Sequence, residues 1–159
     1  QVARLIGDTL KEVIRTQAEE GQTAESAFGA TIIVGGQIKG MEPRLFLIYP
    51  EGNFIEASNE TPFFQAGETK YGRPIILRAF DPAMSFEDAI KLLYVSFDST
   101  LKANLAVGMP LDLHAYETNT FKTGIQRRIP SDDAYFRATS SAWGDALKAA
   151  IDELPDFNF

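Results

Sequence analysis

The chain opens on a segment in which apolar residues recur every three or four positions, the spacing of one face of a helix. Charged residues fill most of the positions between them. This pattern predicts an amphipathic helix over Val2 to Glu20 that ends near Gly21 and is followed by a loop from Gln22 to Ala27. The apolar positions of the expected face are Val2, Leu5, Ile6, Leu10, Val13, Ile14 and Ala18.

Short apolar runs separated by glycine and proline follow this segment. The run from Ala30 to Val34 is rich in β-branched residues, which is typical of a strand. A second run, Arg44 to Tyr49, predicts its antiparallel partner, so we expect a hairpin that pairs residues 30–37 with residues 44–49. Gly35 and Gly36 indicate a bend or bulge in the first strand.

The next stretch predicts further short strands and then a change from the strand pattern to a helix pattern. Pro50-Glu51-Gly52-Asn53 has the composition of a turn, and the chain is expected to return as a strand to Ala57. Phe63 to Ala66 predicts a short fourth strand. Lys70 to Phe80 can form a helix if Pro74 lies in its first turn.

The second half of the chain predicts two long helices on either side of a strand pair. Ser85, with an acidic residue three positions later, predicts the start of a helix that runs to about Asn104. Leu111 to Ala115 alternates apolar and polar residues, as a half-buried strand does, and Phe121 to Ile129 is its expected antiparallel partner. Asp133 is expected to begin a final helix that Pro155 ends.

Runs of strands and runs of helices are therefore separated along the chain, which predicts an α+β fold with antiparallel sheet. The 159 residues contain no internal repeat and no low-complexity linker. We expect residues 1–159 to form one domain, or part of one.

Composition restricts the classes of function. The net charge of −7 argues against a nucleic-acid partner, which requires a basic face. The absence of cysteine and the single histidine exclude thiolate sites and sites built from several histidines, so no metal and no cofactor is expected. The lack of cysteine also suits a reducing cytoplasm. No apolar run approaches the roughly 18 residues of a membrane span, so no membrane association is expected.

Most residues that could carry chemistry have simpler structural explanations. A strand bulge explains Gly35 and Gly36 better than a phosphate loop, because no helix start follows them. His114 has no second histidine beside it and is expected to be a structural or surface residue. Asp132 and Asp133 stand where acidic side chains stabilise a helix start. Trp143 lies on the apolar stripe of the last helix, as a core or subunit-contact residue would.

The segment Gly67-Glu68-Thr69 is the strongest candidate for a site from local pattern alone. It places polar side chains between an expected strand and an expected helix, a junction that often builds functional sites. Thr69 acting as a helix N-cap explains the same residues equally well.

The longer stretches ATIIVGGQIKGMEPRLFLIYPEGNFIEA and FFQAGETKYG resemble the middle of proteasome β-type subunits. GETKYG, VSFDSTLKANLAVG and RRIPSDDAYFRATSSAWG are most similar to the bacterial proteasome-related peptidases of the ancestral β subunit (Anbu) branch. The resemblance covers essentially all 159 residues. It implies the αββα sandwich of N-terminal-nucleophile hydrolases, with the first strands of that sandwich absent from this chain.

The resemblance also implies a reaction. In the family, a Thr or Ser at the mature N-terminus attacks a peptide carbonyl, its own α-amine serves as the base, and a lysine on a strand lowers a pKa nearby. The chain is similar to the C-terminal two-thirds of such a subunit. Gln1 is not a nucleophile, so the catalytic residues are unknown and the nucleophile is expected upstream of Gln1.

Two supporting motifs of the family correspond to residues of this chain, and both differ from the family pattern. The family's Gly-Ser-Gly junction corresponds to Gly67, Glu68 and Thr69, so that Glu68 replaces the serine. The family's Asp-x-x-Ser-Gly motif corresponds to 104–108, where Asn104 replaces the aspartate and Val107 the serine, before Gly108. These six residues are the expected neighbours of the active site.

Three hypotheses follow. The first is a subunit of a self-assembling threonine- or serine-type peptidase, with copies of itself in a ring or spiral as partners and a peptide or protein as substrate. The second is a non-catalytic assembly or binding subunit of the same fold, which the changes at Glu68, Asn104 and Val107 favour. The third is an unrelated α+β ligand-binding domain. In the first case the chain by itself should be inactive.

Overall fold

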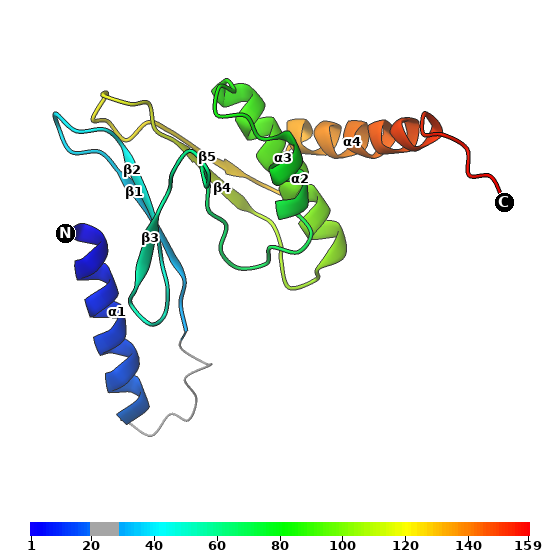
Figure 1. Cartoon of the computed structure of the whole chain (residues 1–159). Coiled ribbons are helices and arrows are strands. Elements are labelled where there is room, and N and C mark those ends of the chain that lie inside the picture. Colours follow the sequence, from blue (N-terminus) through cyan, green and yellow to red (C-terminus); the bar gives the residue numbers. More distant parts are fainter. Residues whose placement is uncertain (20–28) are drawn as a thin grey trace. The chain divides into compact units, whose positions relative to one another are not determined.

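The computed structural model describes residues 1–19 and 29–159 of the chain, which form two compact units (Figure 1). The first unit comprises residues 1–67 and 117–122, and the second comprises residues 68–116 and 123–159. The order of elements is helix, three strands, two helices, two strands and helix, which confirms the predicted order. The loop expected from Gln22 to Ala27 lies outside the described residues.

The first unit contains one helix and a three-stranded antiparallel sheet with strand order β1-β2-β3. Its elements are α1 (Val2–Glu19), β1 (Ile32–Gly36), β2 (Arg44–Ile48) and β3 (Phe54–Glu56). The predicted hairpin is confirmed, since β1 pairs with β2 from Ile32 opposite Ile48 to Gly36 opposite Arg44. The bulge expected at the glycine pair is wrong, because both glycines pair in an uninterrupted register.

The turn after β2 forms as predicted, with the Gly52 amide donating to the Tyr49 carbonyl at 2.8 Å. The fourth strand expected at residues 63–66 does not form. Residues 62–65 are all half-buried, whereas a half-buried strand would alternate between buried and exposed side chains. Pro62 in addition has no N–H to donate to a sheet.

Helix α1 lies against β2 and β3 through a face of small side chains. Ala3 and Gly7 are buried there, and a Cβ on Gly7 would collide with the Gly52 carbonyl. Gly52 itself has a φ of +77°, which favours glycine. The expected apolar face is only partly correct: Leu5 and Val13 are exposed, and Val2, also exposed, lines a hollow beside the β1–β2 hairpin.

The second unit contains three helices and a two-stranded antiparallel sheet. Its elements are α2 (Arg73–Ala79), α3 (Phe86–Ala103), β4 (Leu111–Ala115), β5 (Ile125–Ile129) and α4 (Ala134–Asp152). Pro74 lies in the first turn of α2, as predicted. The N-cap of α2 is Gly72, with no side-chain cap, so the interpretation of Thr69 as the cap is wrong.

The strands β4 and β5 pair along their whole length, from Leu111 opposite Ile129 to Ala115 opposite Ile125. Exposed and half-buried residues alternate along β4, which confirms the predicted half-buried strand. His114 is exposed, and its Nε2 contacts the Thr123 carbonyl. This contact agrees with the expectation of a structural histidine.

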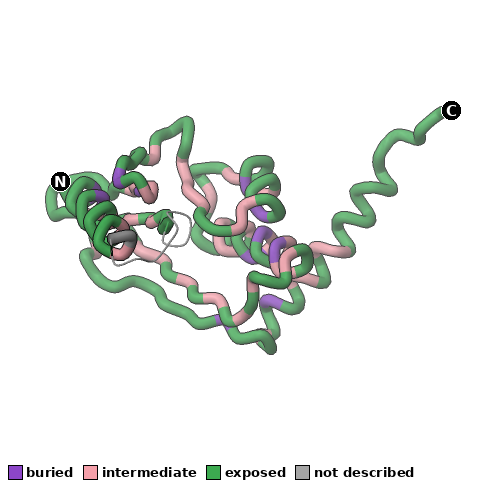
Figure 2. Tube along the Cα trace, turned by 90° about the horizontal axis from the view of Figure 1, so that it is seen from below, coloured by how far each residue is buried: buried purple, intermediate pink, exposed green. Residues whose placement is uncertain are grey.

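The core of the second unit forms where α3, β5 and α4 meet. Tyr94, Ile129 and Phe136 are buried together, and the rings of Tyr94 and Phe136 lie 5.3 Å apart between centroids. Figure 2 shows that buried residues concentrate in this part of α3 and at the start of α4. The expected apolar stripe of α4 is therefore buried at Phe136, whereas Leu147, Ile151 and Leu154 are exposed.

Ser85 caps α3 as predicted, because its hydroxyl oxygen accepts from the Asp88 amide at 3.1 Å. We expect Ser85→Ala to lower the free energy of unfolding by about 1 kcal/mol, since the amide then loses its partner at the helix start. Thermal or denaturant unfolding measures the change, and Ser131→Ala, at an exposed serine before α4, is the control. Equal stability of the two variants would contradict a contribution from the cap.

Candidate functional site

The structure brings together two loops that the sequence places 36 residues apart. Glu68 follows Gly67, which has a φ of +81°, and stands shortly before α2. Asn104 is the C-cap of α3. The Asn104 Nδ2 donates to the Glu68 Oε2 at 2.8 Å, so the two loops adjoin.

Both side chains of this pair are held by backbone amides as well. The Lys70 amide donates to the Glu68 Oε1, and the Ala106 amide donates to the Asn104 Oδ1, each at 2.8 Å. The carboxylate is therefore bound on both oxygens and the amide side chain at both ends. These two anchors have no signal in the sequence, because any residue except proline supplies a backbone N–H and no side chain marks the position.

The pKa of Glu68 lies below the usual value for a glutamate, chiefly because the Lys70 backbone N–H donates to the carboxylate. Partial burial opposes this effect, and the Asn104 hydrogen bond and the positive charge of Lys70 add to it. Glu68 is consequently ionised at neutral pH. It can accept hydrogen bonds or pair with a cation in a fixed geometry, but it is poorly suited to donate a proton.

The other sequence-predicted site residues are arranged around this pair without joining it through side chains. The Val107 amide donates to the Asn104 carbonyl at 3.2 Å, which closes a turn after α3. The Thr69 carbonyl accepts from the Arg73 amide at 3.3 Å. A Cβ on Gly108 would meet no neighbouring atom within 4 Å.

Of the two acidic residues before α4, Asp133 has the structural role expected of it, and Asp132 is exposed. Asp133 caps the helix by accepting from the Phe136 amide at 2.8 Å and also pairs with Arg127. Among residues 1–19 and 29–159, no three His, Cys, Asp or Glu side chains are grouped as metal ligands. Within the same residues no helix is long and apolar enough to cross a membrane.

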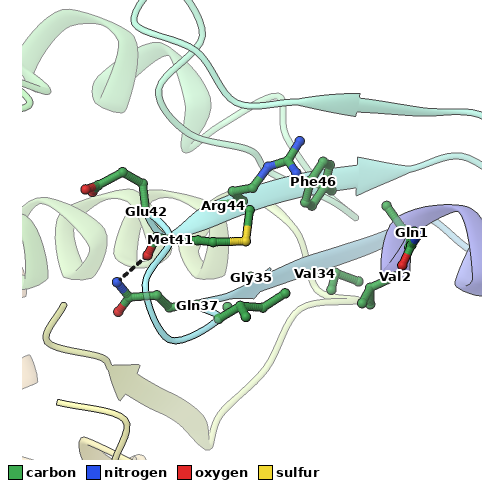
Figure 3. Close-up of a pocket in the computed structure, with 12 residues that line it drawn as sticks. Gln1, Val2, Val34, Gly35, Gln37, Met41, Glu42, Arg44 and Phe46 are labelled. Atoms are coloured by element: carbon green, nitrogen blue, oxygen red, sulfur yellow. Dashed lines mark hydrogen bonds between the residues drawn. The ribbon is translucent and has the colours of Figure 1, made fainter. Parts of the chain in front are cut away.

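A hollow of about 490 Å³ lies in the first unit between the start of α1 and the β1–β2 hairpin (Figure 3). Its lining is mostly apolar and includes Val34, Met41 and Phe46. The Gln37 side-chain amide crosses the hairpin turn and donates to the Met41 carbonyl at 2.8 Å. Its described lining contains no Ser, Thr, Lys or His, and its ionisable side chains are those of Glu42 and Arg44.

Comparisons with known proteins identify the family and the fold. Residues 6–112 match the proteasome subunit family. Two similar solved structures are Anbu (ancestral beta-subunit) from Yersinia bercovieri, at 42% identity and a TM-score of 0.90, and an Anbu (Gly-1) mutant from Hyphomicrobium sp. strain MC1, at 50% identity and a TM-score of 0.89. A third is the helical assembly of the Anbu complex from Pseudomonas aeruginosa, at 40% identity and a TM-score of 0.90.

These matches cover 99% of this chain, which spans 64–65% of the length of the three Anbu chains. No curated protein sequence matches the chain. The similarity extends over both units and all the elements described above, so the fold is of the proteasome type and matches Anbu.

Proposed function

The chain belongs to the proteasome subunit family, and from that premise we propose that it is part of a subunit of a self-assembling bacterial proteasome-related peptidase. The reaction is hydrolysis of an amide bond by an N-terminal Thr or Ser. The observation that carries the proposal is the hydrogen bond between Glu68 and Asn104, which joins the two positions where the family has its supporting proton network.

In this proposal Glu68 is a positioning residue for the nucleophile. A carboxylate held on both oxygens keeps its orientation, and its lowered pKa keeps it charged. Such a group can accept a hydrogen bond from the α-ammonium of the nucleophile or pair with the family's lysine. It would then take the role that a serine has elsewhere in the family, with Asn104 as its support.

The nucleophile itself is proposed to lie on a segment outside residues 1–159. The share of the Anbu chains that these residues span supports this part of the proposal. We expect the 159-residue chain alone to cleave no peptide, because a fixed carboxylate and an amide supply no attacking group.

Partners and location are part of the same proposal. Copies of this chain are the expected partners, because one of the similar structures is a helical assembly of Anbu. The substrate is a peptide or protein, and no nucleic acid or membrane is involved. A cytoplasmic location is favoured by the absence of cysteine.

A non-catalytic subunit of the same fold is the second candidate. The observation that favours it is the replacement of the family's serine, aspartate and serine by Glu68, Asn104 and Val107. In that case the Glu68–Asn104 hydrogen bond only joins two loops, and no nucleophile depends on it.

The test uses the protein expressed from its complete reading frame. We expect it to hydrolyse fluorogenic peptides or to react covalently with an inhibitor directed at N-terminal nucleophiles, with mass spectrometry locating the adduct at the first residue of the mature chain. The 159-residue chain is the matched control and should remain unmodified. A full-length protein that assembles but neither cleaves peptides nor forms the adduct would favour the non-catalytic subunit.

A further inference from the structure

The two halves of α4 have different surroundings. The first half packs Phe136 into the core, and Ser140 accepts a hydrogen bond from Lys102 of α3 at 3.0 Å. Beyond Gly144 the helix contacts little, and every residue from Asp145 to Phe159 is exposed. In Figures 1 and 2 this end of the chain leads away from α2 and α3.

The exposed half carries an apolar stripe of the kind that helices normally bury. Leu147 and Ile151 lie one turn apart on the same face of α4, and Leu154 follows three residues later, directly after the C-cap Glu153. Their exposed fractions are 44%, 66% and 65%. We call these three residues the tail stripe. A stripe of this width on a soluble helix marks an interaction surface.

The surroundings of the tail stripe are acidic. Residues 145–159 contain four carboxylate side chains against one lysine, and that lysine lies 3.4 Å from Asp145. Asp152, Glu153 and Asp156 remain beside the end of the stripe. Two tail stripes facing each other across a two-fold axis would bring like charges together, which is unfavourable. The charges therefore favour a partner with a basic surface.

Helix α2 presents such a surface. The face of α2 that packs on α3 buries Ile76, whereas Leu77 on another face is 63% exposed. Three exposed basic residues lie near Leu77: Arg73 is one turn before it on α2, Arg78 follows it directly, and Lys70 precedes the helix. We call Lys70, Arg73, Leu77 and Arg78 the basic patch. Among the described residues, the guanidinium groups of Arg73 and Arg78 have no ion-pair partner.

We propose that the tail stripe of one copy of this chain binds the basic patch of a second copy. Leu77 would pack among Leu147, Ile151 and Leu154, while Arg73 and Arg78 would face the acidic residues that flank the stripe. The tail stripe cannot cover the patch of its own chain, because the first half of α4 is held on α3 and the tail leads away from α2.

This contact joins two different surfaces, so it repeats from copy to copy. Repetition of such a contact produces a ring when the rotation closes and an open helix when it does not. The inference rests on the proposed self-assembly, for which it names the contact, and it does not depend on peptidase activity. The proposed contact has an apolar centre and a charged rim, which is the usual arrangement of a specific interface.

The experiment compares charge-reversed variants of the full-length protein by sedimentation velocity over a range of concentrations. We expect Arg73→Glu with Arg78→Glu to weaken self-association by at least about tenfold, and Asp152→Arg with Glu153→Arg to do the same. Leu147→Asp with Ile151→Asp should weaken it as strongly. The control is Lys39→Glu with Lys122→Glu, which makes the same change of charge at exposed residues of the first unit.

Mixing the two charge-reversed proteins gives the decisive result. The reversed patch of one protein then complements the reversed tail of the other, so we expect the mixture to associate although each protein alone does not. Circular dichroism checks that each variant is folded. Unchanged association of the variants would overturn the proposed contact while leaving self-assembly intact. A wild-type protein that sediments only as a monomer would overturn the contact and the self-assembly together, and the peptide-cleavage test is independent of both outcomes.

Discussion

Gly72→Ala is expected to lower the free energy of unfolding by about 2 kcal/mol, although it adds a single methyl group. Gly72 is buried at the start of α2. A Cβ there would overlap the Ser96 hydroxyl and lie 2.9 Å from the Ser96 carbonyl oxygen and 3.0 Å from the Thr100 Oγ1. The carbonyl belongs to the middle of α3, so α2 would have to move away from α3. Denaturant unfolding followed by circular dichroism measures the loss.

The same substitution at Gly144 is the matched control for Gly72. Gly144 lies inside α4, and a Cβ on it would meet no neighbouring atom within 4 Å. Gly144→Ala should therefore raise the free energy of unfolding by up to about 1 kcal/mol, because alanine favours the helix interior over glycine. Effects of equal sign at the two glycines would show that α2 and α3 are not packed as described.

Glu68→Ala in the full-length protein is expected to slow the reaction with a nucleophile-directed inhibitor by at least about tenfold. The substitution removes a fixed negative charge and leaves the Lys70 amide and the Asn104 amide group without their acceptor. Glu60→Ala is the control, since Glu60 is an exposed glutamate of the first unit. Equal labelling rates for the two variants would reduce Glu68 to a structural residue of the loop.

The dependence on pH separates positioning from a purely structural role of Glu68. Its pKa is lowered in the folded state, so its contribution to stability is present above the unfolded-state pKa and is lost as the pH falls through the folded-state pKa. The difference in Tm between the wild type and Glu68→Gln should accordingly disappear in acid. If Glu68 positions the nucleophile, Glu68→Gln also removes an anion beside the α-ammonium and so lowers the pKa of that group. The acidic limb of the labelling profile then moves to lower pH, which a purely structural role would not cause.

Some features could be predicted because they depend on neighbours in sequence. The N-cap at Ser85 needs only the amide three residues on, and the half-buried strand at Leu111 to Ala115 shows its alternation directly. The pairing of β1 with β2 follows from two apolar runs joined by a short turn. Local propensity and side-chain period decide each of these features.

Other features failed because the deciding atoms lie far away in sequence. On α3 the large apolar side chains Leu93 and Phe97 are exposed, whereas Ser96, Asp98 and Thr100 are buried. The approach of Gly72 allows small polar side chains at that contact, and Thr100 satisfies its hydroxyl by donating to the Ser96 carbonyl at 3.0 Å. Periodicity in one helix cannot report which face another helix will cover.

The candidate site shows the same division. The sequence by itself determined the order of helices and strands, the ionisable group at Glu68 and the amide at Asn104, because residue type and local pattern decide these. Only the tertiary structure decided that the two side chains meet at 2.8 Å and that backbone amides hold them. The packing of α2 against α3 brings Glu68 and Asn104 together, and this packing depends on the shapes of side chains that are distant along the chain.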